Sequence, residues 1–210
     1  MTNEEQVRRT KTAVEAVLAH ARLQKGLAAY GYDKKKMLEG KARWEKVEML
    51  NHLQKKEYGE SYEATDSLNL AKADAWQVYV RHQEVARVAL KDNRGAYKSL
   101  QLTGERKKDL FGWLAQARTF YANVEGVKEI LAKYSLTEDE VRQGQAMIEA
   151  VYQAHSTRRK EFSDAKQSTQ NRNQALRALT EWTRAFVGIA KVAFANDPEA
   201  LELMGLLKTA

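Results

Sequence analysis

Residues 85–90 read VARVAL and residues 189–194 read IAKVAF, so two segments that start 104 positions apart carry apolar, small and basic residues in the same order. The match continues outward from this stretch at the same interval and without a gap. Further pairs are Leu27 with Leu131, Ala28 with Ala132, Tyr30 with Tyr134, Gly40 with Gly144, Val47 with Val151, Lys56 with Lys160 and Leu102 with Leu206. Roughly eighteen of about 104 paired positions are identical, where ordinary residue usage gives about seven by chance. We interpret the chain as a tandem duplication of a helical unit, with one repeat at residues 1–104 and a second at 105–210, packed together.

The composition indicates an all-α fold. The chain has 210 residues, of which 43% are hydrophobic and 30% are charged, with eleven glycines, one proline and no cysteine. This length is sufficient to bury one sizeable core or two modest ones. The glycine and proline residues are too few for the turns of a many-stranded sheet. The lack of cysteine excludes disulfides, thiolate metal sites and cysteine nucleophiles.

Apolar residues recur at steps of three and four in each half, which is the pattern of amphipathic helices. In the second half, such a stripe over residues 110–134 predicts one helix of about 26 residues. A capping box at Thr137–Glu140 predicts the start of a second helix, and Asp197 followed by Pro198 predicts the start of a short fourth one. We expect three long helices and one short helix in each repeat, arranged as an antiparallel up-and-down four-helix unit.

Two polar stretches decide where the second helix of each repeat ends. Residues 59–70 and 163–174 are rich in Ser, Thr, Asn, Gln and Asp, which favour turns over helix interiors. We expect a turn inside each stretch. The alternative is that each stretch is a polar continuation of the second helix.

The chain shows no candidate membrane span. Its longest uncharged runs, residues 110–117 and 150–157, have eight residues each, against about 20 for a spanning helix. The first residues include two acids and lead into no apolar run, unlike a secretory signal peptide. We therefore expect a cytoplasmic protein.

The four histidines test most enzyme hypotheses, because they are the neutral-pH bases and metal ligands of the chain. A di-iron bundle requires Glu-x-x-His on one helix face, but no glutamate stands three residues before His20, His52, His82 or His155. No His-Glu-x-x-His pair occurs either. We expect no catalytic residue, no metal and no cofactor.

Two histidines lie on predicted apolar stripes, His82 on the third helix and His155 on the second helix of the other repeat. Antiparallel packing would bring His82 to about the height of Asn51 and of Glu15. One hypothesis is a small-ligand or metal site in the helical core formed by His82, Glu15 and Asn51, with His155 as a candidate in the other repeat. The interpretation that we favour is structural, because buried polar groups need hydrogen-bond partners and such layers set helix register.

Charge offers a second functional signal. The formal net charge is +7 and the pI is about 9.4, so weak attraction to phosphate-rich surfaces is expected. Basic clusters coincide in the two halves and are formed by Lys55, Lys56, Arg158, Arg159 and Lys160. They could bind a nucleic-acid backbone or another anionic surface. We favour ordinary solvated helix faces, because acids are interleaved with the bases and no nucleic-acid-binding motif is present.

The tryptophans fall on or beside apolar stripes and are expected to anchor cores. Trp76 is the exception, because it stands one step off its stripe and we expect it to be exposed at an interface. Taken together, these patterns predict a non-enzymatic, cytoplasmic helical-bundle protein that binds another protein, as an interaction or scaffold module. They indicate neither the identity of the partner nor an oligomeric state.

Overall fold

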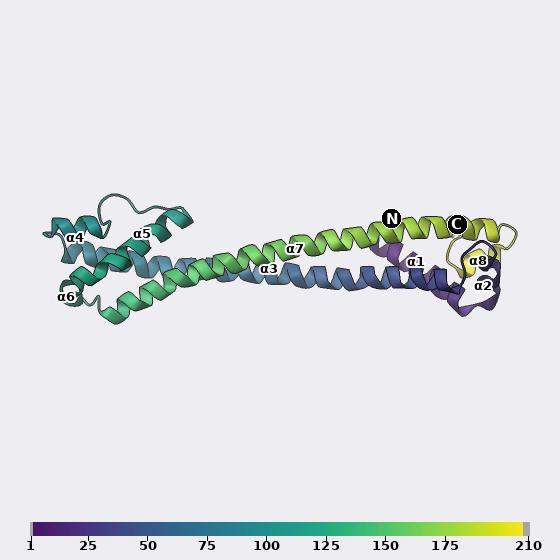
Figure 1. Cartoon of the computed structure of the whole chain (residues 1–210), viewed down its shortest axis with the longest axis horizontal. Coiled ribbons are helices and arrows are strands. Elements are labelled where there is room, and N and C mark those ends of the chain that lie inside the picture. Colours follow the sequence, from purple (N-terminus) through teal and green to yellow (C-terminus); the bar gives the residue numbers. More distant parts are fainter. Residues whose placement is uncertain (1, 208–210) are drawn as a thin grey trace. The chain divides into compact units, whose positions relative to one another are not determined.

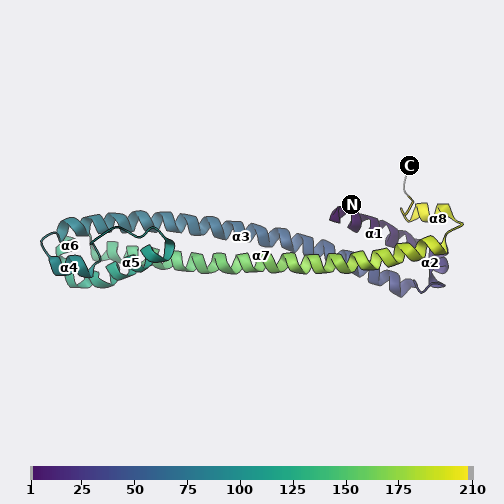
Figure 2. The ribbon, with the colours of Figure 1, turned by 90° about the horizontal axis from the view of Figure 1, so that it is seen from above.

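The computed structural model describes residues 2–207, and this range consists of helices and turns without a strand (Figures 1 and 2). The predicted all-α class is therefore confirmed. The elements in chain order are α1 (Asn3–Ala19), α2 (Ala21–Ala28), α3 (Lys34–Ala89), α4 (Arg94–Ser99), α5 (Leu110–Asn123), the 3₁₀ helix η1 (Val124–Val127), α6 (Lys128–Ala132), α7 (Glu138–Ala193) and α8 (Pro198–Leu203).

The turns predicted within residues 59–70 and 163–174 are wrong, because α3 and α7 run through these ranges as helices of 56 residues each. Buried positions continue the helical spacing there, with Ala64 and Leu68 on α3 and Ala165 and Ser168 on α7. Most of the polar residues between them are exposed, so they form the solvent face of a continuing amphipathic helix. The second and third helices of each predicted repeat are thus one helix, and the up-and-down four-helix unit does not form within a repeat.

The chain divides into two compact units, and each takes segments from both predicted repeats. Unit 1 comprises Met1–Gly59 and Ser163–Ala210, whereas unit 2 comprises Glu60–Phe162. Unit 1 therefore holds α1, α2, the first part of α3, the last part of α7 and α8. Unit 2 holds the rest of α3 and α7 together with α4, α5, η1 and α6. The division at residue 104 stays a prediction about the sequence, and the compact units divide the chain differently.

In unit 1, α1, α2 and α8 pack on a pair of helices formed by α3 and α7. The pair is antiparallel: Gly40, near the start of α3, lies against Trp182 near the end of α7, and further along α3 the Gln54 Nε2 donates to the Thr169 Oγ1 at 2.9 Å. The buried apolar side chains include Val14, Val17, Leu27, Met37, Trp44, Val47, Leu179, Trp182, Phe186 and Met204. Because burial of each large apolar side chain contributes about 1.5–3 kcal/mol, this core is the main stabilising feature of the unit.

Unit 2 has an aromatic core where α5 packs on the last part of α3 and the first part of α7. Tyr79 of α3 lies within ring-contact distance of three α5 side chains, with centroid separations of 6.2 Å to Trp113, 5.8 Å to Phe120 and 6.3 Å to Tyr121. Trp76 meets Trp113 edge-on at 5.4 Å. Such pairs add about 0.5–1.5 kcal/mol each to the free energy gained by burial alone.

Two glycines that stand 104 residues apart each allow an aromatic ring to approach a helix backbone closely. A Cβ atom at Gly40 would lie 2.7 Å from the Trp182 Cζ3, and one at Gly144 would lie 2.7 Å from the Tyr121 Cε1. Both distances are shorter than carbon atoms tolerate without a shift of the ring. Glycine is therefore needed at each position so that an aromatic ring can lie directly on the helix backbone.

The backbone repeats at the same interval of 104 residues. The bounds of α7 and α8 are those of α3 and α4 displaced by this interval. Four residues with left-handed φ angles also pair in this way, Gly31 (80°) with Ser135 (63°) and Gln101 (53°) with Gly205 (63°). After each of the four, the N–H of the following residue donates to the carbonyl of the residue five positions before that donor, at 2.9–3.1 Å. This hydrogen bond is typical of the Schellman motif at a helix C-terminus.

Helix starts and breaks differ in part from the prediction. Asp197 caps α8 as predicted, since its side chain accepts from the Ala200 N–H at 3.2 Å. Thr137 accepts from the Glu140 N–H at 3.4 Å, but the Glu140 side chain bonds to α3 instead of closing the capping box. The single helix predicted over residues 110–134 is wrong, because η1 separates α5 from α6 at a stretch where Asn123 and Gly126 are poor helix formers.

Within residues 2–207, no helix combines the length and the apolar character that a membrane span requires.

Candidate functional site

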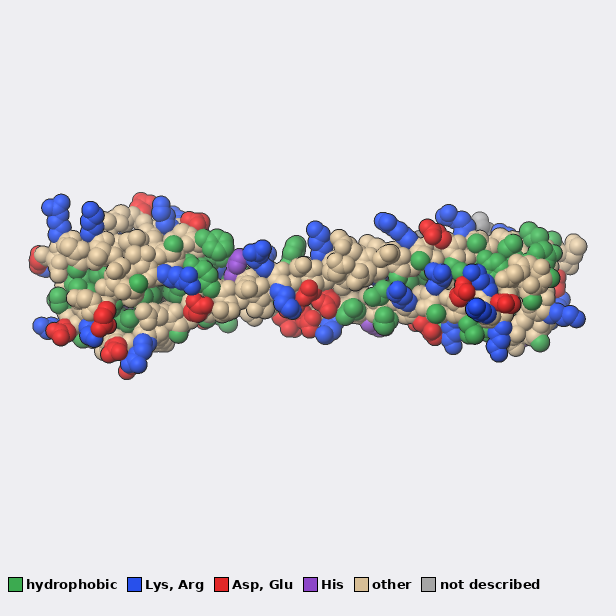
Figure 3. All heavy atoms as spheres, viewed as in Figure 1, with side chains coloured by type: hydrophobic (Ala, Val, Ile, Leu, Met, Phe, Trp, Pro, Cys, Tyr) green, Lys and Arg blue, Asp and Glu red, His purple; other side chains and the backbone are tan. Residues whose placement is uncertain are grey.

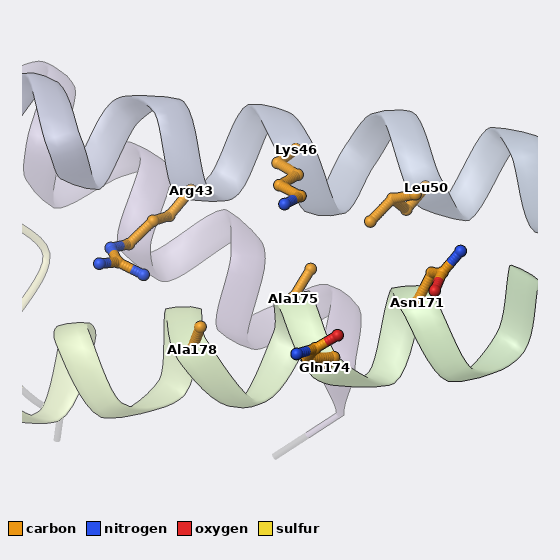
Figure 4. Close-up of a pocket in the computed structure, with 7 residues that line it drawn as sticks. All are labelled: Arg43, Lys46, Leu50, Asn171, Gln174, Ala175 and Ala178. Atoms are coloured by element: carbon orange, nitrogen blue, oxygen red, sulfur yellow. The ribbon is translucent and has the colours of Figure 1, made fainter.

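A cavity of about 390 Å³ lies between α3 and α7 in unit 1 (Figure 4). The residues that line it are Arg43, Lys46 and Leu50 from α3 and Asn171, Gln174, Ala175 and Ala178 from α7. Figure 4 shows the Arg43 and Lys46 side chains extending from α3 toward α7, with α1 behind the pair. The small side chains on α7 leave the space that the two longer basic side chains enter.

The cavity is electropositive. Its lining contains two cations and two carboxamides and no carboxylate. The Arg43 Nε is buried and finds no hydrogen-bond acceptor within residues 2–207. Glu39 acts on Arg43 only at longer range, because the pKa of Glu39 is lowered first by its hydrogen bond with Lys36 and to a smaller extent by the Arg43 charge. The two cations of the lining would favour an anion in the cavity.

Apolar side chains border the cavity along α3. Leu50 is buried, whereas Met49 is 59% exposed and Leu53 is 38% exposed. Because Lys46, Met49, Leu50 and Leu53 follow the three- and four-residue steps of one helix face, the basic end of the cavity continues into an apolar strip. A ligand that fits this surface needs negative charge at one end and apolar groups along the rest.

The opposite side of the same helix pair is covered by α1. Val7 packs with Trp44 and Leu179, and the Thr10 and Thr183 hydroxyls share a buried hydrogen bond of 2.8 Å. No residue of α1 lines the cavity. The helix pair of unit 1 thus accepts a third helix on one side and leaves the groove on its other side open.

The corresponding positions in unit 2 lack the basic character. At the interval of 104 residues, Arg43 and Lys46 correspond to Met147 and Ala150, and Ala178 corresponds to Asp74. The electropositive cavity is therefore a property of unit 1 and is not required by the helix pairing itself.

His82 is buried in unit 2, with a side chain only 2% exposed. Its Nδ1 lies 3.0 Å from the Tyr121 hydroxyl and its Nε2 lies 3.0 Å from the Glu140 Oε2. Glu140 also forms an ion pair with Arg81. Burial lowers the pKa of His82, against the raising effect of its hydrogen bond with Glu140, and burial raises the pKa of Tyr121. A neutral imidazole with its proton on Nε2 would donate to Glu140 and accept at Nδ1 from the Tyr121 hydroxyl, and the Arg81 Nη2 also lies 3.3 Å from Nε2.

Glu15 and Asn51 were the predicted partners of His82. Its ring nitrogens instead form hydrogen bonds with Tyr121 and Glu140. Glu15 is exposed on α1 and Asn51 is half-buried on α3, both in unit 1. His155 lies half-buried on α7 in unit 2, where the Phe111 ring meets it edge-on at 5.1 Å. The ligand-binding role proposed for these residues stays a prediction.

The predicted anion-binding residues are placed on both long helices. Lys55 and Lys56 are exposed on α3 in unit 1, and Arg158, Arg159 and Lys160 lie on α7 in unit 2. Lys160 pairs with the adjacent Glu161 at 2.9 Å. Basic and acidic side chains are also interleaved on the faces of both units that Figure 3 shows. A joint basic surface stays a prediction.

The sequence prediction did not identify Arg43 and Lys46. A usable signal was present, since the first repeat carries cations where the second carries Met147 and Ala150. Comparison of the chain with protein-family models, with curated proteins and with solved structures gives no match. The function must therefore be argued from the sites themselves.

Proposed function

We propose that the chain is a non-enzymatic interaction module whose unit 1 groove binds an acidic, amphipathic helix of a partner protein. The observation that carries this proposal is the open cavity between α3 and α7, with Arg43 and Lys46 directed into it. A carboxylate of the partner would pair with these two cations.

The helix pair supports a helical ligand in particular. One groove of the pair already holds α1 through an apolar contact at Val7 and a hydrogen bond at Thr10. A second helix in the open groove would meet the exposed Met49 and Leu53 and place an anchor side chain against Leu50. Helix-in-groove recognition uses such a combination of apolar anchors at helical spacing and complementary charge.

The polar network of unit 2 favours a structural role over catalysis. Both ring nitrogens of His82 are hydrogen-bonded and the ring is almost fully buried. A general base must reach the proton of a substrate, and His82 is enclosed by Tyr121 and Glu140. We therefore retain the non-enzymatic interpretation, together with the expectation of a cytoplasmic protein.

We also infer that the chain arose by duplication of one helical segment. The support is the 104-residue interval shared by the sequence match, the helix bounds and the four left-handed positions. The two compact units correspond under this interval, because each combines the first part of one copy with the second part of the other.

The proposed function is tested with a fluorescein-labelled peptide of about 20 residues, long enough for about five helical turns, with acidic residues at one end and an apolar stripe. Fluorescence anisotropy measures its binding to the full chain and to the double variant Arg43→Gln/Lys46→Gln. We expect the double variant to weaken binding at least about tenfold, equivalent to about 1.4 kcal/mol. The matched control Lys55→Gln/Lys56→Gln removes the same number of charges from exposed lysines of α3 outside the cavity and should leave the affinity unchanged.

A second peptide with the same charges and serine in place of the apolar residues separates groove binding from simple charge attraction. Equal affinity for the two peptides, or equal loss with Lys55→Gln/Lys56→Gln and with Arg43→Gln/Lys46→Gln, contradicts the proposal. Tighter binding of a single-stranded oligonucleotide that depends on Lys55 would instead support the alternative of nucleic-acid binding.

A further inference from the structure

A second cavity, of about 340 Å³, lies in unit 2 and is lined by two indole rings. Trp76 of α3 and Trp113 of α5 form one wall, and Asn69, Lys72, Ala73 and Lys108 complete the lining. Trp113 is buried in the core of the unit, whereas Trp76 is half-buried and contributes a more accessible ring. The edge-on contact of 5.4 Å between the two rings fixes the orientation of Trp76.

Two cations flank this aromatic wall. Lys72 is half-buried and Lys108 is exposed, and within residues 2–207 neither forms an ion pair with an acid of the chain. Asn69 adds a carboxamide, and no carboxylate lines the cavity. The site therefore offers an aromatic surface for a planar ring and two ammonium groups for a negative charge.

The described residues of unit 1 at the corresponding positions do not form an equivalent of this site. Trp76 corresponds at the 104-residue interval to Thr180, which accepts a hydrogen bond of 2.6 Å from the Gln6 Nε2 of α1. Lys72 corresponds to Leu176, which packs against the core. In unit 1, Leu176 and Thr180 thus lie where α1 packs, whereas in unit 2 the corresponding Lys72 and Trp76 line an open cavity.

We propose that this cavity binds a small aromatic anion, a planar ring joined to a phosphate or carboxylate group. The ring stacks against the Trp76 indole, and the anionic group lies between the Lys72 and Lys108 ammonium groups. The cavity and the unit 1 groove share no residue, so this proposal does not depend on the proposed function.

Tryptophan fluorescence of the full chain, excited where nucleotides do not absorb, measures the binding. The probes are AMP and benzoate, which combine a ring with a phosphate or a carboxylate, and the fragments adenosine and inorganic phosphate. We expect saturable quenching by AMP or benzoate, with Kd raised about tenfold in Lys72→Gln and in Lys108→Gln, the effect of one lost charge-assisted hydrogen bond. Lys107→Gln removes a neighbouring exposed lysine outside the cavity and should leave Kd unchanged. Trp76→Phe should remove most of the quenching.

The probes also identify the anionic group, since binding of AMP alone indicates a phosphate and binding of benzoate alone a carboxylate. Far-UV circular dichroism checks that each variant keeps its helix content, and the substituted lysines are not part of the buried core. The proposal is overturned if neither probe gives saturable quenching, if adenosine binds as tightly as AMP, or if the lysine variants and Lys107→Gln have the same Kd.

Discussion

The contact between Gly40 and Trp182 allows a prediction in which two effects of opposite sign can be separated. In Gly40→Ala, the added Cβ overlaps the outer ring of the Trp182 indole. That indole is 7% exposed and stacks on Phe186 with a centroid separation of 5.2 Å and an interplanar angle of 15°. Because Tyr32 also meets the indole edge-on at 6.0 Å, the ring cannot move away without disturbing its neighbours.

The expected change in the free energy of unfolding combines a helix-propensity effect and an overpacking effect. Replacing glycine by alanine inside a helix stabilises by about 1 kcal/mol, whereas an extra carbon in a packed core destabilises by about 1–3 kcal/mol. Gly188→Ala, in α7 of the same unit, is the matched control, because its Cβ meets nothing within 4 Å. We expect Gly188→Ala to raise the free energy of unfolding by about 1 kcal/mol, and Gly40→Ala to lie about 1–3 kcal/mol below Gly188→Ala.

Urea unfolding followed by circular dichroism measures both variants, with unchanged m-values as the check that the denatured state is the same. The double variant Gly40→Ala/Trp182→Phe should recover stability relative to the sum of the single changes, because phenylalanine lacks the overlapping ring atoms. The reasoning is refuted if Gly40→Ala stabilises the chain as much as Gly188→Ala does.

Three further changes test other parts of the structure. His82→Leu removes both ring nitrogens from Tyr121 and Glu140 and should lower the free energy of unfolding at pH 7.5 by about 1–3 kcal/mol, as measured by urea unfolding. The free energy of unfolding of the wild type should also fall as the pH drops below 6.5, because burial lowers the pKa of His82 and the unfolded chain then binds the proton more readily. If His82→Leu shows the same pH dependence as the wild type, His82 is not the group responsible. Ser135→Gly should stabilise by about 1 kcal/mol, because Ser135 has a φ of 63° that glycine adopts without penalty, and a lower urea midpoint would contradict this expectation. Asp197→Ala removes the cap of α8 and should destabilise by about 0.5–2 kcal/mol, with faster amide exchange in residues 198–203 as the local signature.

The helical class and several helix boundaries were predictable, because they depend on local patterns. The cap at Asp197 and the apolar stripe that buries His82 are set by residues within a few turns of each other. The continuity of α3 was not predictable in the same way. Polar residues in 59–70 favour a turn in isolation, and only pairing of α3 with α7 gives their buried neighbours Ala64 and Leu68 an apolar surface to contact.

The site residues were harder to predict for the same reason. A hairpin within each repeat would have brought His82 beside Asn51, whereas the continuous helices bring Glu140 of α7 to His82. Arg43 and Lys46 resemble ordinary surface cations in the sequence, and their direction into a cavity depends on the small residues that α7 places opposite them. The pairing of α3 with α7, which no local pattern encodes, thus determines both the partners of His82 and the cavity lined by Arg43 and Lys46.

The pairing of a continuous α3 with α7 is tested most directly by cysteine cross-linking, since the natural chain has no cysteine to interfere. The double variant Gln54→Cys/Thr169→Cys places two thiols where the native side chains are hydrogen-bonded at 2.9 Å. The control Gln54→Cys/Arg177→Cys moves the second thiol about 12 Å along α7. With a short bismaleimide cross-linker, which spans the gap left when glutamine is shortened to cysteine, peptide mass spectrometry should find a rapid intramolecular link between positions 54 and 169 and little between 54 and 177. Equal or absent linkage in both variants would contradict the antiparallel pairing on which the proposed unit 1 groove depends.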